Sequence, residues 1–354
     1  EYICTYVDDL LFVGKDPEMF FKRLREIHKF QLNGVGEPKY HLGGGFHRAV
    51  KPEPILTWGS KTYIRRMLAN YKNIFHEEVK KKKVYSPLER GDHPELDESE
   101  FCDELNKKHY LCMVGELQWA VTLGRFDIMC AVNAMSRYRP QPRVGHMDRL
   151  KRMYQYLNTY PETSIKFNTE IPDYSMYEKI AKPSDWGWVY HPCTEEIPVD
   201  APVPKGKPVR HTVFCDANLM ANVVNGKSNI GVLHMVNKTL IEWYSKSTLT
   251  VETPTYGTEF CAARTAVDQI VDIRYSLRML GVPILDDEAS WMFGDNLSVV
   301  NSSTLPGGKL IKRNHILNYH RVREAQACGV CNFIHMEGIK NPSDALSKFR
   351  SSKD

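Results

Sequence analysis

The sequence predicts a multidomain α/β protein whose C-terminal unit is a mixed five-stranded sheet with flanking helices. Its 354 residues are about twice a typical domain. From residue 211 onward, patterns for three strands and a helix precede two further strand–helix pairs. A segment with eight prolines between residues 161 and 208 precedes them and differs in composition from its neighbours. We divide the chain into 1–48, 49–160, 161–209 and 210–354, and the change in composition supports the boundaries around the proline-rich segment.

The first two segments contain a hairpin and several helices. Residues 1–14 read as strand, turn and strand, with the turn expected at Asp8-Asp9. Apolar spacing predicts helices over 17–30 and 61–71, and three packed helices between 101 and 157. The glycines of residues 42–46 predict a bend or a close approach to another segment. The chain begins inside an apolar run without Met, so we expect sequence upstream of it.

The proline-rich segment 161–209 is expected to be a tether, with the aromatic residues of 185–190 docked on a neighbour. In the last segment, strands are expected near 211–218, 229–237, 240–245, 291–296 and 330–335. Helices are expected at 255–280, 315–327 and 342–349. No stretch approaches the roughly 18 apolar residues of a membrane span, so we expect no membrane partner.

Composition says little about partners. Apolar residues make up 42% and charged residues 25% of the chain, as in ordinary globular proteins. The net charge of +4 is too small to identify a nucleic-acid partner by itself. Nine dispersed cysteines predict free thiols in a reducing compartment. Cys328 and Cys331 form a CxxC pair, but Gly329 between them favours a helix end over a metal or redox site.

Two groups of carboxylates are candidates for metal binding. Asp8 and Asp9, on the predicted hairpin, suit a divalent ion such as Mg²⁺, although aspartate is also common in ordinary turns. The second group is dispersed along the last segment, at strand ends and helix starts of the predicted sheet: Asp216, Glu259, Asp295 and Asp344. If the four converge, they cannot all stay ionised without cations between them, which implies a pair of Mg²⁺ ions. Helix capping or turns would explain the last three but leave Asp216 unexplained.

Several short motifs resemble the Pol polyprotein of copia-type LTR retrotransposons, in the same order. The YVDD box of reverse transcriptases matches Tyr6–Asp9, and residues 36–43 are similar to the family's segment around the primer grip. Residues 243–246 resemble WSSK, 294–296 resemble the CDN box and 344–348 resemble ADIFTK. The resemblance implies the end of a reverse transcriptase palm in 1–48, a thumb or connection in 49–160, and a ribonuclease H-like domain in 210–354.

The resemblance also implies roles for single residues. It places Asp216, Glu259, Asp295 and Asp344 on the metal-binding carboxylates of ribonuclease H, with Asp216 shared between two Mg²⁺ ions, or Mn²⁺ in their place. Asp8 falls on a polymerase metal ligand, with Asp9 beside it. His335 lies nine residues before Asp344 and is either the end of a strand or a proton shuttle.

The implied activity is Mg²⁺-dependent hydrolysis of the RNA strand of an RNA–DNA hybrid. The residues expected to contact nucleic acid are Lys246, Asn296, Lys312, Arg313 and His320. The expected partners are the hybrid and the remaining fingers and palm of the parent polyprotein. The expected location is the cytoplasm, within a virus-like particle, with the nucleus as a second location during integration. The alternatives are an inactive remnant that folds and binds nucleic acid, and a two-metal nuclease of the same fold that cuts duplex DNA.

The polymerase part is expected to be inactive in this chain. The family's other essential aspartate lies on a strand upstream of the YVDD hairpin, and two carboxylates without it make a poor two-metal site. In primer extension on a homopolymer template, the chain should therefore incorporate no more dNTP than an Asp8→Asn variant. Incorporation well above that control would contradict this expectation.

Overall fold

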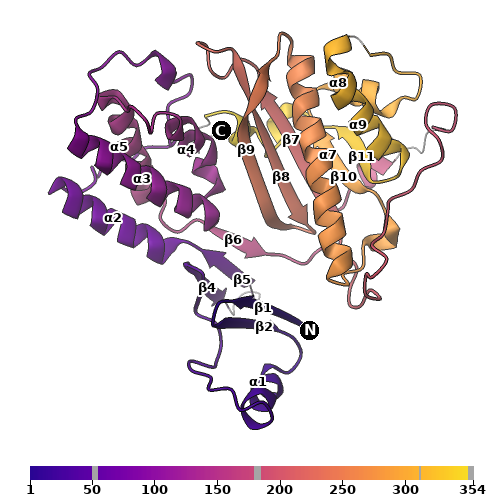
Figure 1. The fold of residues 1–354 in the computed structure, drawn as a ribbon, viewed down its shortest axis with the longest axis horizontal. Helices are drawn as coiled ribbons and strands as arrows, with labels where there is room; N and C mark the ends of the chain where they lie inside the picture. The colour runs from indigo at the N-terminus through magenta and orange to yellow at the C-terminus, as the bar shows by residue number, and fades with distance from the viewer. Residues whose placement is uncertain (50–54, 179–184, 311, 350–354) are drawn as a thin grey trace.

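Three parts follow one another along the chain in Figure 1: a hairpin with one helix, a helical unit, and an α/β unit built on a five-stranded sheet. The computed structural model describes residues 1–49, 55–178, 185–310 and 312–349. Within those ranges, none of the helices is long and apolar enough to cross a bilayer.

The N-terminal hairpin is present as expected, with its turn one residue earlier. Strands β1 (Tyr2–Tyr6) and β2 (Asp9–Val13) pair antiparallel with Tyr6 opposite Asp9, so the turn is Val7-Asp8. Val7 has a φ of 55°, an unfavourable value for a β-branched residue. Helix α1 (Pro17–Glu26) is shorter than expected and stacks Phe20 on Phe12 with ring centroids 4.5 Å apart.

A four-stranded antiparallel sheet, which sequence analysis missed, follows the hairpin. Its strands, in order, are β3 (Tyr40–His41), β4 (Gly44–Ala49), β5 (Ile55–Gly59) and β6 (Ser164–Phe167). The sheet therefore joins residues on both sides of the divisions placed at 48/49 and 160/161. A Cβ at Gly44 would lie 2.1 Å from the Trp58 ring, which is the kind of close approach that the glycine run predicted.

The helical unit contains α2 (Lys61–Phe75) and the three helices expected between 101 and 157. These are α3 (Glu104–Thr122), α4 (Met129–Ser136) and α5 (Val144–Thr159). Its core includes the fully buried side chains of Met113, Leu117 and Met153. Just before α4, the buried guanidinium of Arg125 donates to both carboxylate oxygens of Asp127, at 2.9 and 2.7 Å.

The C-terminal unit has the expected mixed five-stranded sheet, in the order β11-β10-β7-β8-β9. Its strands are β7 (His211–Asn218), β8 (Lys227–Val236), β9 (Thr239–Val251), β10 (Ser290–Gly294) and β11 (Cys331–His335). The first three pair antiparallel, whereas β10 lies parallel to both β7 and β11. Parallel pairing of β7 with β10 puts the carboxyl ends of these two strands at the same edge of the sheet.

Helices cover both faces of this sheet. On one face lie α7 (Thr255–Met279), α8 (Leu297–Thr304) and α9 (Ile316–Ala327). Helix α8 was not expected, although Asn296 supplies a start signal: its Oδ1 accepts from the backbone N–H of Val299 at 3.2 Å. The short helix α10 (Asp344–Ser347) and the helical unit cover the other face, where Met129 and Trp243 pack against a buried cluster with Leu346.

The proline-rich segment is docked on the C-terminal unit, as its aromatic residues predicted. It contains the short helix α6 (Ser175–Glu178). Trp186 is 9% exposed, and the Arg323 guanidinium lies 4.8 Å from its ring centroid. Glu195 accepts two hydrogen bonds from Arg274, both of 2.7 Å. These contacts run along the outer side of α7 and α9.

A disulfide joins Cys193 of this segment to Cys328, with the two Cα atoms 4.9 Å apart. The expectation of free thiols is therefore wrong for these two cysteines, and the other seven are free. The partners are 135 residues apart, so no local spacing pointed to the pair. Gly329, at φ 70°, follows the end of α9, which confirms the helix-end interpretation of the CxxC pair.

Candidate metal centre and adjoining cleft

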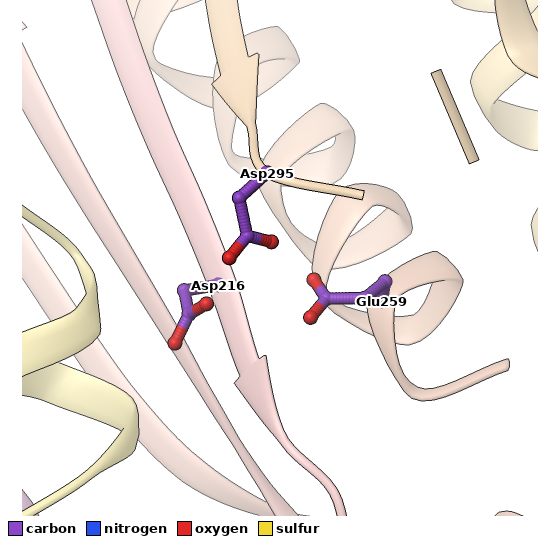
Figure 2. A group of neighbouring side chains, drawn as sticks. All are labelled: Asp216, Glu259 and Asp295. Carbon is purple, nitrogen blue, oxygen red and sulfur yellow. The ribbon is translucent and has the colours of Figure 1, made fainter. Parts of the chain in front are cut away.

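Three carboxylates converge at the edge of the C-terminal sheet. Asp216 lies on β7, Glu259 lies near the start of α7, and Asp295 directly follows β10. Each offers one oxygen, and these oxygens lie within 4.8 Å of one another. Figure 2 shows the three side chains pointing toward a common point from three different elements.

Burial makes this cluster electrostatically unfavourable without a cation. Asp216 is 0% exposed and Glu259 is 9% exposed. Burial, followed by the negative charges of Asp344 and Asp295, raises the pKa of Asp216 to about 6, although Lys348 and Ser347 act against this rise. Burial together with Asp216 and Asp295 raises the pKa of Glu259 well above its ordinary value. A divalent cation would relieve both effects.

The donor set fits such a cation. Asp216 Oδ1 is buried and has no hydrogen-bond partner among the described residues. An unpaired buried carboxylate oxygen is costly, and the residue that carries it forms a cluster with Glu259 and Asp295. Carboxylate oxygens are the ligands that Mg²⁺ and Mn²⁺ prefer. Asp216, Glu259 and Asp295 are therefore the residues that would hold a divalent ion.

Asp344 lies beside this group but is not one of the three mutually close carboxylates. Its Oδ1 is 2.5 Å from Lys348 Nζ, and the same ammonium is 3.3 Å from Asp216 Oδ2. The Ser347 hydroxyl also donates to Asp216 Oδ2. The two oxygens of Asp216 thus have different surroundings, because Oδ2 faces donors of the C-terminal segment and Oδ1 does not.

Two features place this segment against the sheet. The Asn341 side-chain amide donates to the backbone carbonyl of Cys215 at 2.8 Å, next to Asp216. Gly231, directly opposite Asp216 on β8, leaves room for α10: a Cβ there would lie 2.7 Å from both Leu346 Cβ and the Ser343 carbonyl oxygen. Any larger residue at position 231 would push Asp344 and Lys348 away from Asp216.

His335 ends β11, and its Nε2 lies 3.0 Å from the backbone carbonyl oxygen of Asp295. The ring therefore contacts the main chain of a cluster residue. A role as proton shuttle stays a prediction.

Asp8 and Asp9 do not join the cluster. Both are exposed on the hairpin, which lies below the five-stranded sheet and apart from it in Figure 1. The hairpin exposes Ile3 and Tyr6 on β1 and Val7 in its turn, which leaves an apolar edge without a partner strand among the described residues.

The residues expected to bind nucleic acid have varied positions. Asn296 directly follows Asp295, and its side chain caps α8. Lys246 is exposed on β9, and Arg313 is exposed before α9. The Lys312 ammonium is 3.3 Å from the Thr253 hydroxyl, and the His320 Nδ1 is 2.8 Å from the Tyr190 hydroxyl of the docked segment.

A cleft of about 860 Å³ adjoins the carboxylates, between the helical unit and the five-stranded sheet. Its lining includes Arg90 and Arg137 from the helical unit, Asn229 from the sheet, and Asp344 and Lys348 at the metal centre. Arg137 also donates to Asn229 Oδ1 at 3.2 Å, which links its two walls. Sequence analysis missed this cleft because its walls come from segments that are distant in the sequence. Arg137 and Asn229, for example, are 92 residues apart.

Comparison with known proteins finds relatives among transposon polyproteins. No family model matches the sequence. The chain is 25% identical, over 98% of its length, to the Pol polyprotein from transposon TNT 1-94 of Nicotiana tabacum. It is 22% identical, over 98% of its length, to the Pol polyprotein from transposon RE1 of Arabidopsis thaliana. The chain is homologous to a segment of the Pol polyproteins of copia-type retrotransposons. It spans 23% of the first relative and 20% of the second.

Solved structures give weaker matches. The N-terminal RNase H domain of rv2228c from Mycobacterium tuberculosis is 12% identical, with a TM-score of 0.31, over 39% of this chain and 91% of that chain. RNase H1 from Halobacterium salinarum NRC-1 is 13% identical, with a TM-score of 0.29, over 40% of this chain and 95% of that chain. At these scores the likeness adds nothing to the sheet topology described above.

Asp216→Asn is expected to stabilise the metal-free protein at pH 7.5 by roughly 3 kcal/mol. Folding raises the pKa of Asp216 from 3.8 to about 6, so the native state disfavours the charged carboxylate. In wild type, the charged carboxylate lowers the free energy of unfolding fully above pH 6, the folded pKa, and not at all below the unfolded pKa of 3.8. The stability advantage of Asp216→Asn over wild type should therefore shrink as the pH falls from 6 to 4.

Urea unfolding in EDTA at the two pH values measures this difference. Asp200→Asn, at an exposed carboxylate, is the matched control. If the Asp216→Asn variant is no more stable than wild type at pH 7.5, the buried negative charge of Asp216 does not destabilise the metal-free protein.

Proposed function

We propose that the C-terminal unit is a ribonuclease H that hydrolyses the RNA strand of an RNA–DNA hybrid. The observation that carries the proposal is the convergence of Asp216, Glu259 and Asp295 at one sheet edge. Homology to Pol polyproteins along nearly the whole chain supports it, because these elements are copied through RNA. The parent polyprotein is also the proposed source of polymerase activity, with Asp8 and Asp9 in that part, and the virus-like particle in the cytoplasm is the proposed location.

In the proposed site, a cation would supply the chemistry and fixed side chains would hold the cation in place. A bound Mg²⁺ or Mn²⁺ ion would activate water and stabilise the charge that develops on the phosphate. Asp216, Glu259 and Asp295 would hold that ion, with Asp216 fixed by the sheet. The Ser347 hydroxyl, by donating to Asp216 Oδ2, restricts rotation of this carboxylate. The buried strands on either side exclude water from one side of the cluster.

The adjoining cleft supports a nucleic-acid substrate. Arg90 and Arg137 are exposed basic side chains on its wall, suited to phosphates. Two acidic residues of this wall are already paired, since Asp92 binds Arg149 at 2.8 Å and Glu95 binds His93 at 3.0 Å.

The test is incubation of the purified chain with a hybrid labelled on both strands, with Mg²⁺ or EDTA. We expect Mg²⁺-dependent cutting of the RNA strand alone. Asp216→Asn should lower the cleavage rate by about a thousandfold or more, since a missing carboxylate disables the metal site, while hybrid binding changes little. Cutting of duplex DNA would instead indicate a different nuclease, and binding without cutting would indicate an inactive remnant; either result would overturn the proposal.

Arg90→Ala is expected to weaken hybrid binding several-fold at low salt and to reduce the slope of log affinity against log salt by about one, because one phosphate contact is lost. Fluorescence anisotropy with Ca²⁺ in place of Mg²⁺ measures this. Arg139→Ala is the matched control, because Arg139 is exposed nearby and does not line the cleft. Equal losses in the two variants would mean that the cleft is not the binding surface.

A further inference from the structure

The C-terminal segment brings a positive charge of its own to the metal centre. Lys348 Nζ lies between Asp344 Oδ1, at 2.5 Å, and Asp216 Oδ2, at 3.3 Å. Lys348 follows directly after α10, and its backbone N–H donates to the Asp344 carbonyl at 3.0 Å, which holds the two residues together. The ammonium is therefore built into the site by the same turn that presents Asp344.

This arrangement makes the two sides of Asp216 unequal. On one side, Oδ1 is buried and has no hydrogen-bond partner among the described residues, and Asp216 offers one of its two oxygens to the cluster with Glu259 and Asp295. On the other side, Oδ2 receives the Lys348 ammonium and the Ser347 hydroxyl. A cation placed between Asp216 and Asp344 would have to displace the ammonium, whereas a cation among Asp216, Glu259 and Asp295 would not.

We propose that Lys348 takes the place of a second divalent ion, so that the chain binds one ion tightly, at Asp216, Glu259 and Asp295, and pairs Asp344 with Lys348. This inference replaces the two ions expected from the sequence, in which Asp344 would have held the second ion together with Asp216. It deepens the proposed function and rests on it for its meaning in the reaction, where the ammonium would neutralise charge beside the scissile phosphate. The side chain of Lys348 is 37% exposed, so it has room to approach a phosphate from the cleft.

The physical reason is a competition between cations. A tethered ammonium has no translational freedom to lose on binding, whereas a free ion must give up both its freedom and part of its water shell. Mg²⁺ in particular loses bound water reluctantly. Removing the ammonium takes a positive charge away from beside two buried carboxylates, which strengthens their attraction for a second ion.

The test counts bound Mn²⁺ without nucleic acid, from the free Mn²⁺ signal in electron paramagnetic resonance during a titration. Wild type should bind one ion tightly, and Lys348→Arg should also bind one because it keeps the charge. Lys348→Met should bind two, with the second ion bound about tenfold or more tightly than any second ion in wild type. Lys340→Met is the matched control, since Lys340 pairs with Glu337 at 2.8 Å outside the cluster, and it should bind one.

Two tight ions in wild type would overturn the inference, as would a single ion in a folded Lys348→Met variant. Thermal unfolding establishes whether that variant is folded; if it is not, the counts for wild type and Lys348→Arg decide. The count is independent of cleavage. If wild type binds one Mn²⁺ ion but does not cleave RNA, the proposed function is wrong and this inference stands. If wild type binds two ions tightly and cleaves RNA, this inference is wrong and the proposed function stands.

Discussion

The burial of one carboxylate, Asp216, is the constraint on which the rest of the C-terminal unit depends. It lies in the middle strand of the sheet with no exposed surface. A charge in that position is stable only if other groups compensate for the lost water. Lys348 and Ser347 compensate the charge on Asp216 Oδ2, and Glu259 and Asp295 lie close enough to Asp216 that the three would hold a cation together.

The chain places these compensating groups by packing segments that are distant in sequence. Parallel pairing of β10 with β7 brings Asp295 beside Asp216. The absence of a side chain at Gly231 lets α10 lie on the sheet, and the Asn341 amide holds the preceding loop to β7. Loss of either contact would move Lys348 and Asp344, so the precision of the site depends on residues that take no part in its chemistry.

The parts outside the sheet complete the surroundings of this site. The helical unit supplies one wall of the cleft, and the Asn133 side chain donates to the Ser245 carbonyl of β9 at 2.7 Å. The proline-rich segment lies along α7 and α9, held by Glu195, by Trp186 and by the disulfide to Cys328. The five-stranded sheet is thus covered on one face by helices from its own sequence and on the other by a preceding unit together with α10.

The sequence by itself determined the elements that depend on local patterns. Apolar spacing located the helices around Leu117 and Phe260 and the strands that carry Asp216 and Asp295, because helix and strand periods are properties of short segments. Apart from the cluster of Asp216, Glu259 and Asp295, which the sequence already indicated, tertiary structure alone decided which distant groups meet. It paired β6 with β5, Cys193 with Cys328 and Lys348 with Asp216. Such pairs leave no local pattern, because they follow from how whole segments pack and from the need to balance buried charge.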